Sequence, residues 1–293
     1  MTLRGRLKPL LRGLRTIVFA ATDRLALLGT APRNTGGIAV LMPHGLGDLV
    51  LCTPFIRALQ ARQADEALTL VCSADAEAYA RHCLPAWRII AIERLRMWRD
   101  PRYRFRVLRA MARIGPRLVI QPMPNRDHWV DDALMRASGA RERLGCVGND
   151  MMITPAQRRR GDVWYTRLLP DTGEAHDIGH YAAVFQAVTG AALPCAWPAL
   201  ARPPRSALVP DAPYVVLAHE ASIAEKVWPA ARFASAAEAI AARTGATIVA
   251  VGHGAFRGDG VLDLGGRLDL AGLIAVLAHA RVVVTNDSAP LHL

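Results

Sequence analysis

The feature that most constrains the fold is an apolar run that ends in a glycine turn close to residue 45. Residues 38–42 read IAVLM, and the turn PHGLGD follows at residues 43–48. A short buried strand that enters a turn with two glycines and then a helical pattern is how a Rossmann-like domain begins. Gly45 and Gly47 would let backbone approach a ligand, and Asp48 would lie at the mouth of the cleft. The third glycine of a dinucleotide-binding fingerprint is missing.

Strand-like and helix-like segments alternate after this turn. The helix that follows it contains Pro54, so it either begins at Asp48 and kinks or begins with Thr53 as its N-cap. Residues 154–172, which include three consecutive arginines at 158–160, lack periodicity and predict a loop. The alternation predicts a parallel, doubly wound sheet. Its predicted strands are 38–42, 68–72, 89–92 and 118–121, and its predicted helices are 49–62, 76–83, 102–114, one that ends at Ser138, and 180–189.

A proline-rich segment divides the chain. Six prolines lie between residues 194 and 213, which predicts a linker at 191–212 between an N-terminal domain (38–190) and a C-terminal domain (213–293). The second domain repeats the α/β pattern. Its predicted strands are 214–218, 247–251 and 282–285, with a short apolar run at 261–263, and its predicted helices are 230–242 and 270–279.

Positive charge is concentrated in a leader, residues 1–37. The chain has a formal net charge of +11, and this leader holds seven basic residues and one acid, Asp23. Leucines at near-helical spacing predict a basic amphipathic helix, which would either lie on an anionic membrane surface or pack on the body of the protein. Its longest uncharged run, residues 16–22, is much shorter than the roughly 20 residues that span a bilayer. Arginines 12 and 15 interrupt any signal-peptide core.

The rest of the composition limits the class of protein. The 293 residues are 52% hydrophobic, enough for two domains with buried cores. Five scattered cysteines without a C-x-x-C pair predict reduced thiols in the cytoplasm, with neither a disulfide framework nor a zinc site. The arginines of the leader are not interleaved with aromatic stacking residues, so we do not expect a nucleic-acid partner.

Four stretches together resemble glycosyltransferase family 9, the family of the lipopolysaccharide heptosyltransferases. They are Gly47-Asp48 with Thr53-Pro54, the segment KVWP at 226–229, the segment LDLGG at 262–266, and Asn286-Asp287-Ser288 with His292. The sequence departs from the family pattern in carrying His219-Glu220 where proline and glycine are common, and Ala289 where glycine is usual. A family member would also continue for about another 50 residues, so the second domain is expected to be incomplete.

The resemblance implies two facing Rossmann-like domains, the GT-B arrangement. It places a nucleotide-sugar donor, such as ADP-heptose, mainly on the second domain and a lipid-linked acceptor on the first. It implies no metal and no other cofactor, because helix N-termini and a cationic side chain would stabilise the leaving diphosphate.

The resemblance also assigns roles to single residues. Asp48 would be the general base that takes the proton of the acceptor hydroxyl, although an acid there is equally typical of a helix N-cap. His44, Gly45 and Gly47 would form the loop on the acceptor side. The donor would be bound by Lys226, as a point charge on its phosphates, together with Ser222, Asp287, Ser288 and His292.

The function predicted from the sequence is an inverting, metal-independent glycosyltransferase. It would move a sugar, plausibly a heptose, to a lipopolysaccharide core or similar lipid-linked acceptor at the inner face of the cytoplasmic membrane. Two alternatives stay open: a nucleotide-sugar epimerase of the same architecture, which needs no acceptor, and an inactive truncated chain that only binds a membrane or a partner.

Overall fold

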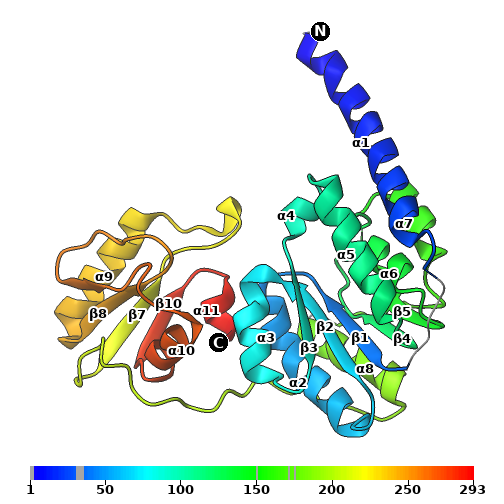
Figure 1. Cartoon of the computed structure of the whole chain (residues 1–293). Coiled ribbons are helices and arrows are strands. Elements are labelled where there is room, and N and C mark those ends of the chain that lie inside the picture. The colour runs from blue at the N-terminus through cyan, green and yellow to red at the C-terminus, as the bar shows by residue number, and fades with distance from the viewer. Residues whose placement is uncertain (1–2, 31–35, 150, 171, 175) are drawn as a thin grey trace. The chain divides into compact units, whose positions relative to one another are not determined.

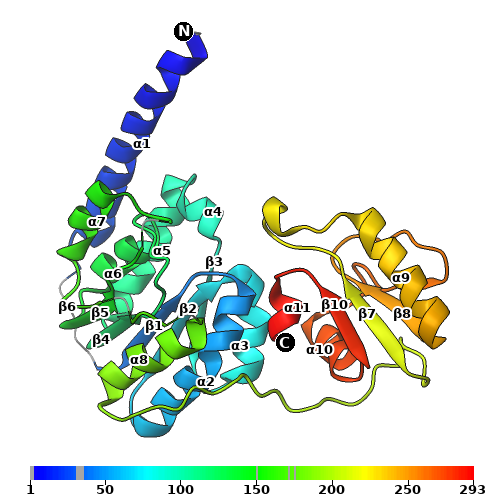
Figure 2. The same cartoon turned by 180° about the vertical axis from the view of Figure 1, so that it is seen from behind.

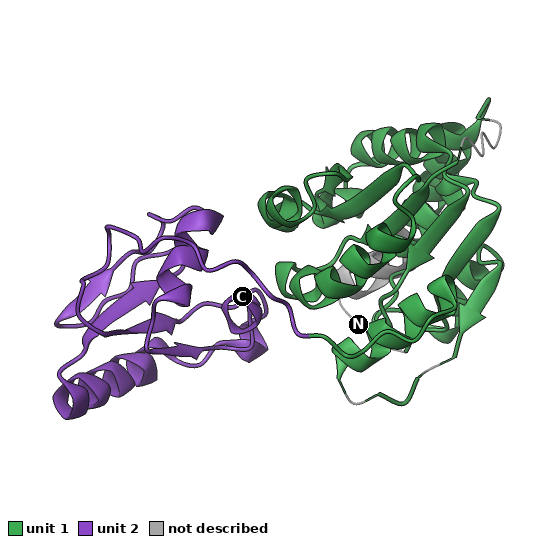
Figure 3. Ribbon diagram, turned by 90° about the horizontal axis from the view of Figure 1, so that it is seen from below, with its two compact units in different colours: residues 1–196 green, residues 197–293 purple. Residues whose placement is uncertain are grey.

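The computed structural model describes residues 3–30, 36–149, 151–170, 172–174 and 176–293, and it leaves the side chains of residues 3–12 and 14 undescribed. The chain divides into two compact units, unit 1 (Met1–Ala196) and unit 2 (Trp197–Leu293), which Figure 3 shows in different colours. The division falls inside the proline-rich segment 191–212. The segment Asn34-Thr35-Gly36-Gly37 is typical of a linker, and its first two residues lie outside the described residues.

Unit 1 is a three-layer α/β unit built on a six-stranded parallel sheet of order β3-β2-β1-β4-β5-β6. Helices α1, α5 and α6 cover one face, and α2, α3 and α8 cover the other (Figures 1 and 2). Its elements are α1 (Leu3–Leu27), β1 (Ile38–Met42), α2 (Leu46–Arg62), β2 (Leu68–Ser73), the 3-10 turn η1 (Ala74–Ala76), α3 (Glu77–Cys83), β3 (Arg88–Ile92), α4 (Arg94–Met97), α5 (Pro101–Ile114), β4 (Leu118–Gln121), α6 (Asp131–Ser138), β5 (Glu142–Cys146), α7 (Pro155–Asp162), β6 (Arg167–Leu169) and α8 (Asp177–Thr189).

Unit 2 contains a four-stranded parallel sheet of order β10-β7-β8-β9. Phe233 and Ala237 of α9 pack on one face, and Val276 of α10 packs on the other. Its elements are β7 (Tyr214–Ala218), the 3-10 turn η2 (Ala224–Lys226), α9 (Ala230–Thr244), β8 (Thr247–Val251), β9 (Val261–Asp263), α10 (Leu270–Ala278), β10 (Val282–Thr285) and α11 (Ala289–His292).

Both units have the same strand order around their first strand. In unit 1, β1 pairs with β2 on one side and β4 on the other, and in unit 2, β7 pairs with β8 and β10. In each unit the strands that come next in the chain are added on one side of this first strand, and later strands are added on its other side. Ligands of open parallel sheets bind beyond the carboxyl ends of the strands at such a switch point. The residues that follow β1 and β4, and those that follow β7 and β10, are therefore where the fold places its binding sites.

The predicted parallel α/β fold is confirmed, and most strand bounds agree. Strands β1, β2, β4 and β7 are largely apolar runs that are buried on both faces. All five residues of β1 and of β7 are buried. Helix α2 starts before Pro54 and includes it, so the interpretation of Thr53 as an N-cap is wrong. Within α2 the hydroxyl of Thr53 instead donates to the carbonyl of Leu49 at 2.7 Å.

The predicted loop at 154–172 is wrong, because it contains α7 and the edge strand β6. The N–H of Thr154 donates to Gln157 Oε1 at 3.0 Å, and Thr154 Oγ1 accepts from the N–H of Gln157 at 3.3 Å, which together form a capping box. Pro155 occupies the first helical position, where its missing N–H costs nothing. This local signal was present in the sequence and outweighs the lack of apolar periodicity.

Residues 3–27 of the leader form helix α1, which packs on the body of unit 1. Packing on the body was one of the two alternatives expected for the leader. Phe19 and Ala26 of α1 are buried, and α1 contacts α5. Arg104 of α5 forms a buried pair with Asp23, with Nε–Oδ1 at 2.5 Å and a second hydrogen bond from NH2 to Oδ2 at 2.7 Å. Among the described residues no helix is long and apolar enough to cross a membrane.

Candidate functional site

The turn after β1 presents Asp48 from the first turn of α2. Asp48 Oδ2 accepts a hydrogen bond from the N–H of Gly45 at 2.9 Å, so the carboxylate closes the first turn of the helix from its third position. The side chain is half-buried. Gly45 has φ −66° and Gly47 lies inside the helix, so neither glycine is needed for a left-handed backbone. What they supply is the absence of a side chain beside Asp48.

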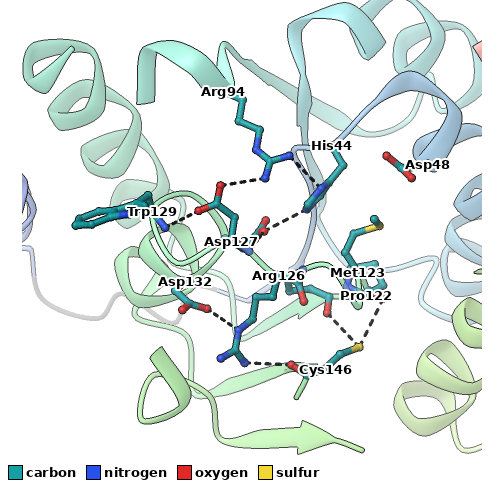
Figure 4. A network of polar contacts seen from close by, with 12 residues as sticks. His44, Asp48, Arg94, Pro122, Met123, Arg126, Asp127, Trp129, Asp132 and Cys146 are labelled. Carbon is teal, nitrogen blue, oxygen red and sulfur yellow. Dashed lines mark hydrogen bonds and ion pairs between the residues drawn. The ribbon is translucent and has the colours of Figure 1, made fainter. Parts of the chain in front are cut away.

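His44 is buried in a charged network that joins three segments of unit 1 (Figure 4). Its Nε2 lies 3.1 Å from Asp131 Oδ2 and its Nδ1 lies 3.3 Å from Arg94 NH1. A guanidinium can only donate, so Nδ1 is the acceptor and Nε2 carries the proton. The expected loop residue on the acceptor side is therefore a fixed, oriented imidazole.

Asp127 is the second carboxylate of this network and comes from the segment after β4. Its Oδ2 accepts from Arg94 NH2 at 2.9 Å and from Trp98 Nε1 at 3.1 Å. Burial raises the pKa of Asp127 and the nearby carboxylate of Asp131 raises it further, while Arg94 opposes both. Arg94 thus pairs directly with Asp127 and contacts the imidazole of His44, which binds the second buried acid, Asp131. The Arg94 side chain keeps a quarter of its surface exposed. Such an arrangement is typical of sites that bind or position a polar ligand.

A neighbouring cluster around Arg126 is structural. The Arg126 side chain is fully buried, with Nε 3.0 Å from Asp132 Oδ1 and NH2 2.5 Å from Asp162 Oδ1. Asp132 also accepts from the hydroxyl of Tyr165 at 2.8 Å. A Cβ on Gly161 would overlap the Asp132 carboxylate, so this glycine allows the close approach. The cluster ties α6 and α7 together beneath the loop that carries Asp127.

In unit 2 the structure brings two of the predicted donor-binding residues into direct contact. Lys226 Nζ lies 2.5 Å from Asp287 Oδ2, and both side chains are largely exposed. The hydrogen bond from Lys226 lowers the pKa of Asp287. The sequence contains only one other lysine, Lys8, against 34 arginines, which is 36 basic residues minus two. A flexible ammonium at the switch point is thus unusual for this chain.

Asn286 holds this part of unit 2 together. Its side chain is buried, its Oδ1 accepts from the N–H of Trp228 at 3.0 Å, and its Nδ2 donates to the carbonyl of His219 at 2.8 Å. One amide thus connects the end of β10 to both ends of the loop that follows β7. The sequence motif at 286–288 contained this residue, but its role as a connector was not predicted.

The other predicted donor-binding residues lie on the same two segments. Ser222 is exposed on the loop after β7, and Ser288 directly precedes the short helix α11, with its hydroxyl 3.5 Å from the carbonyl of Asn286. His292 is the last residue of α11.

Glu220, where the family pattern has glycine, is bound to backbone donors. Its two oxygens accept from the N–H groups of His253 at 2.6 Å and Gly254 at 2.8 Å. Burial raises the pKa of Glu220, but these two hydrogen bonds and the electrostatic effect of His219 and His253 together lower it below its usual value. Gly252 and Gly254 permit the approach, because a Cβ on either would lie 2.9 to 3.0 Å from a Glu220 oxygen. The N–H groups of the turn after β8 are therefore bound by a carboxylate of the protein itself, that of Glu220.

The turn at 262–266, another part of the family pattern, has a structural role. Gly266, with φ +67°, donates its N–H to the carbonyl of Gly252 at 2.8 Å. Asp263 accepts from the N–H groups of Phe256 and Gly265. These contacts fix the turn after β8, and through it Glu220.

Comparison with known proteins gives the class and then the family. No curated protein sequence matches the chain. E. coli heptosyltransferase WaaC, solved with ADP-2-deoxy-2-fluoro heptose, aligns over 87% of this chain and 84% of its own, with a TM-score of 0.63 and 16% identity. A family 9 glycosyl transferase from Veillonella parvula DSM 2008 aligns over 90% and 78%, with a TM-score of 0.61 and 19% identity. E. coli ADP-heptose lps heptosyltransferase II aligns over 87% and 80%, with a TM-score of 0.60 and 17% identity.

These likenesses and the two parallel α/β units show the GT-B fold. The model of glycosyltransferase family 9 (heptosyltransferase) matches residues 146–293, which is half of the chain. The chain belongs to glycosyltransferase family 9. The expected resemblance is confirmed.

Proposed function

We propose that this glycosyltransferase moves a heptose from a nucleotide-diphosphate donor, such as ADP-heptose, to a lipopolysaccharide core or similar lipid-linked acceptor. The observation that carries the proposal is the constellation at the switch point of unit 2, where Asn286 fixes the loop after β7 and Lys226 lies against Asp287. A lysine held there by an exposed carboxylate is a point charge that a diphosphate can take over.

The reaction is a single displacement. An acceptor hydroxyl attacks the anomeric carbon, the bond from that carbon to the diphosphate oxygen breaks with its electron pair, and the hydroxyl proton passes to Asp48. Attack opposite to the leaving group inverts the anomeric configuration. Lys226 and the backbone N–H groups at the start of α11 stabilise the charge that grows on the diphosphate, in place of a metal. Ser222, Ser288 and His292 bind the rest of the donor.

Asp48 suits the role of base because its orientation is already fixed. The hydrogen bond from the N–H of Gly45 holds the half-buried carboxylate at the mouth of the turn after β1. Proton transfer to a positioned carboxylate contributes about 10²- to 10⁴-fold to a rate. The same position of the Asp48 carboxylate serves both to cap α2 and to accept a proton, so the two roles are compatible.

We place the enzyme in the cytoplasm, at the inner face of the membrane that holds its lipid-linked acceptor. The described cysteines are all thiols, four of them buried, which suits a reducing compartment.

The test compares Asp48→Asn with the wild-type chain on ADP-heptose and a heptose-deficient lipopolysaccharide acceptor. The asparagine can still accept from the N–H of Gly45, so we expect unchanged thermal unfolding and a kcat lowered by about 100-fold or more. Asp65→Asn, in the loop between α2 and β2, is the matched control and is expected to turn over normally.

Three further readouts separate the parts of the proposal. The anomeric configuration of the product, measured by NMR, tests inversion, and turnover in excess EDTA tests metal independence. Incubation with donor alone tests the epimerase alternative. Near-normal turnover by Asp48→Asn would contradict the role of Asp48 as general base. Conversion of the donor without acceptor would favour the epimerase over the transferase.

A further inference from the structure

Helix α1 uses one narrow stripe to bind the body of unit 1. Phe19, Thr22, Asp23 and Ala26 are buried, and their spacing of three, one and three residues places them on one face of the helix. Phe19 packs edge-on against Trp129, and Arg104 lies over the Phe19 ring at 5.0 Å while it pairs with Asp23. This half of α1 is therefore a fixed part of unit 1.

The opposite face of α1 is apolar as well, which a helix that faces water would not be. Ile17 is 67% exposed, Leu25 is 55% exposed and Leu28 just beyond the helix is 63% exposed. At 100° per residue these three positions fall within about 80° of one another and point away from the buried stripe. Solvated helix faces normally carry charged or polar residues, so this face lacks its covering.

The sequence before this segment continues the pattern. Leucine stands at positions 3, 7, 10 and 14, and Ile17, Ala21, Leu25 and Leu28 follow at the same spacing of three or four. The helix itself begins at Leu3 and its first half extends beyond α5 and α6 (Figures 1 and 2). The apolar row is thus longer than the part of α1 that contacts the body.

Helix α5 extends the apolar face and adds charge. Leu25 of α1 and Phe105 of α5 line one open hollow of about 600 Å³, together with Arg102 and Arg106. Phe105 is itself exposed. Asp100 also lines this hollow, but its carboxylate accepts from the N–H groups of Arg102 and Tyr103 and from Arg96. The exposed side chains around the hollow are therefore apolar and cationic.

Charge decides which partner covers this face. Residues 3–27 contain six basic residues and one acid, and that acid, Asp23, is paired internally with Arg104. Two copies of α1 joined along the apolar row would place arginines beside arginines, whereas stable coiled coils place opposite charges there. An anionic surface meets both requirements, since it takes up apolar side chains and attracts the arginines.

We propose that the outward face of α1, with Phe105 and the arginines of α5, lies on an anionic lipid bilayer. Ile17, Leu25 and Leu28 enter the boundary between headgroups and acyl chains, and Arg24, Arg102 and Arg106 contact lipid phosphates. The inference concerns membrane binding and does not depend on the reaction proposed above.

The test measures partition of the full chain, without donor or acceptor, onto vesicles of about 30 mol% phosphatidylglycerol in phosphatidylcholine. We expect Leu25→Glu to lower the partition coefficient by about tenfold or more, because an interfacial leucine is replaced by a charge that the surface repels. Ile17→Glu, two turns earlier, should act in the same direction. Leu208→Glu, an exposed leucine of unit 2, is the matched control and should bind like the wild type.

Two comparisons complete the design. Binding should weaken when salt is raised from about 0.1 M to about 1 M, because the Debye length falls from about 10 Å to about 3 Å. Asp48→Asn should bind vesicles like the wild type, so failure of the proposed reaction leaves this test intact. Circular dichroism confirms that each variant is folded.

Three results would overturn the proposal. One is wild-type partition by both Leu25→Glu and Ile17→Glu. A second is equal binding of the wild-type chain to pure phosphatidylcholine. The third is a lipid-free dimer in analytical ultracentrifugation that Leu25→Glu dissociates, which would assign the face to a second copy of the chain.

Discussion

Asn286→Ala tests whether one buried amide organises the donor side of unit 2. The substitution removes the acceptor for the N–H of Trp228 and the donor to the carbonyl of His219. Each intramolecular hydrogen bond contributes about 1 kcal/mol, so the loss is about 2 kcal/mol if water reaches the two released backbone groups. Trp228 is 39% exposed, so water can solvate its N–H, and a much larger loss is not expected.

The functional consequence concerns Lys226, which stands two residues before Trp228. Without the anchor the loop samples more conformations, and the donor must select the one that places the ammonium on its phosphates. If about 2 kcal/mol of loop order is lost, donor affinity falls by up to about 30-fold. We expect the loss in Asn286→Ala to approach that of Lys226→Ala, although Asn286 itself binds no donor in this interpretation.

The assay combines guanidinium unfolding with calorimetric titration of ADP, using Asn125→Ala of unit 1 as a control amide substitution. Asn286→Asp is a sharper comparison, since it keeps an acceptor for Trp228 but sets a carboxylate against the His219 carbonyl. We expect it to bind ADP at least as weakly as Asn286→Ala. Wild-type ADP affinity in both variants, with the expected loss of stability, would refute the coupling between Asn286 and Lys226.

Two further predictions concern stability. Asp23→Asn should lower the free energy of unfolding by about 3–5 kcal/mol, because Arg104 is 1% exposed and would lose its buried partner. Glu77→Gln breaks an exposed pair with Arg81 and should cost less than about 1 kcal/mol in the same urea titration. Glu220 has a folded pKa below its usual 4.5, so its stabilisation is present above pH 4.5 and is lost as the pH falls through the lower, folded value. Between pH 5 and acid conditions of about pH 3, Glu220→Gln should therefore lose less stability than the wild type, and equal slopes would contradict the assignment.

The central strands of both sheets could be predicted from the sequence because they are buried on both faces. Runs such as residues 38–42 and 214–218 contain no polar residue that faces water. The carboxyl ends of parallel strands meet at one edge of a sheet, and ligands bind at that edge. Because Asp48 and Asp287 each follow a strand, the sequence alone places each of them at a binding edge.

The buried network around His44 could not be predicted in the same way. His44, Arg94, Asp127 and Asp131 come from three segments that meet only because β1 lies between β2 and β4. A single sequence gives the strands but not their order. The polar stretch after β4 was a usable signal, since charged residues directly after a parallel strand face the switch point, but nothing in it identified Arg94 as the partner.

Glu220 narrows where the phosphates of a donor can be held in the proposed reaction. The turn after β8 offers the N–H groups of His253 and Gly254, and backbone donors of this kind are common phosphate ligands. In this chain both already bind the Glu220 carboxylate, and the lowered pKa keeps that carboxylate ionised at neutral pH. A diphosphate at this turn would have to displace an anion and then meet its repulsion. The charge of the donor is therefore left to Lys226, which pairs with Asp287, and to the backbone that follows β10.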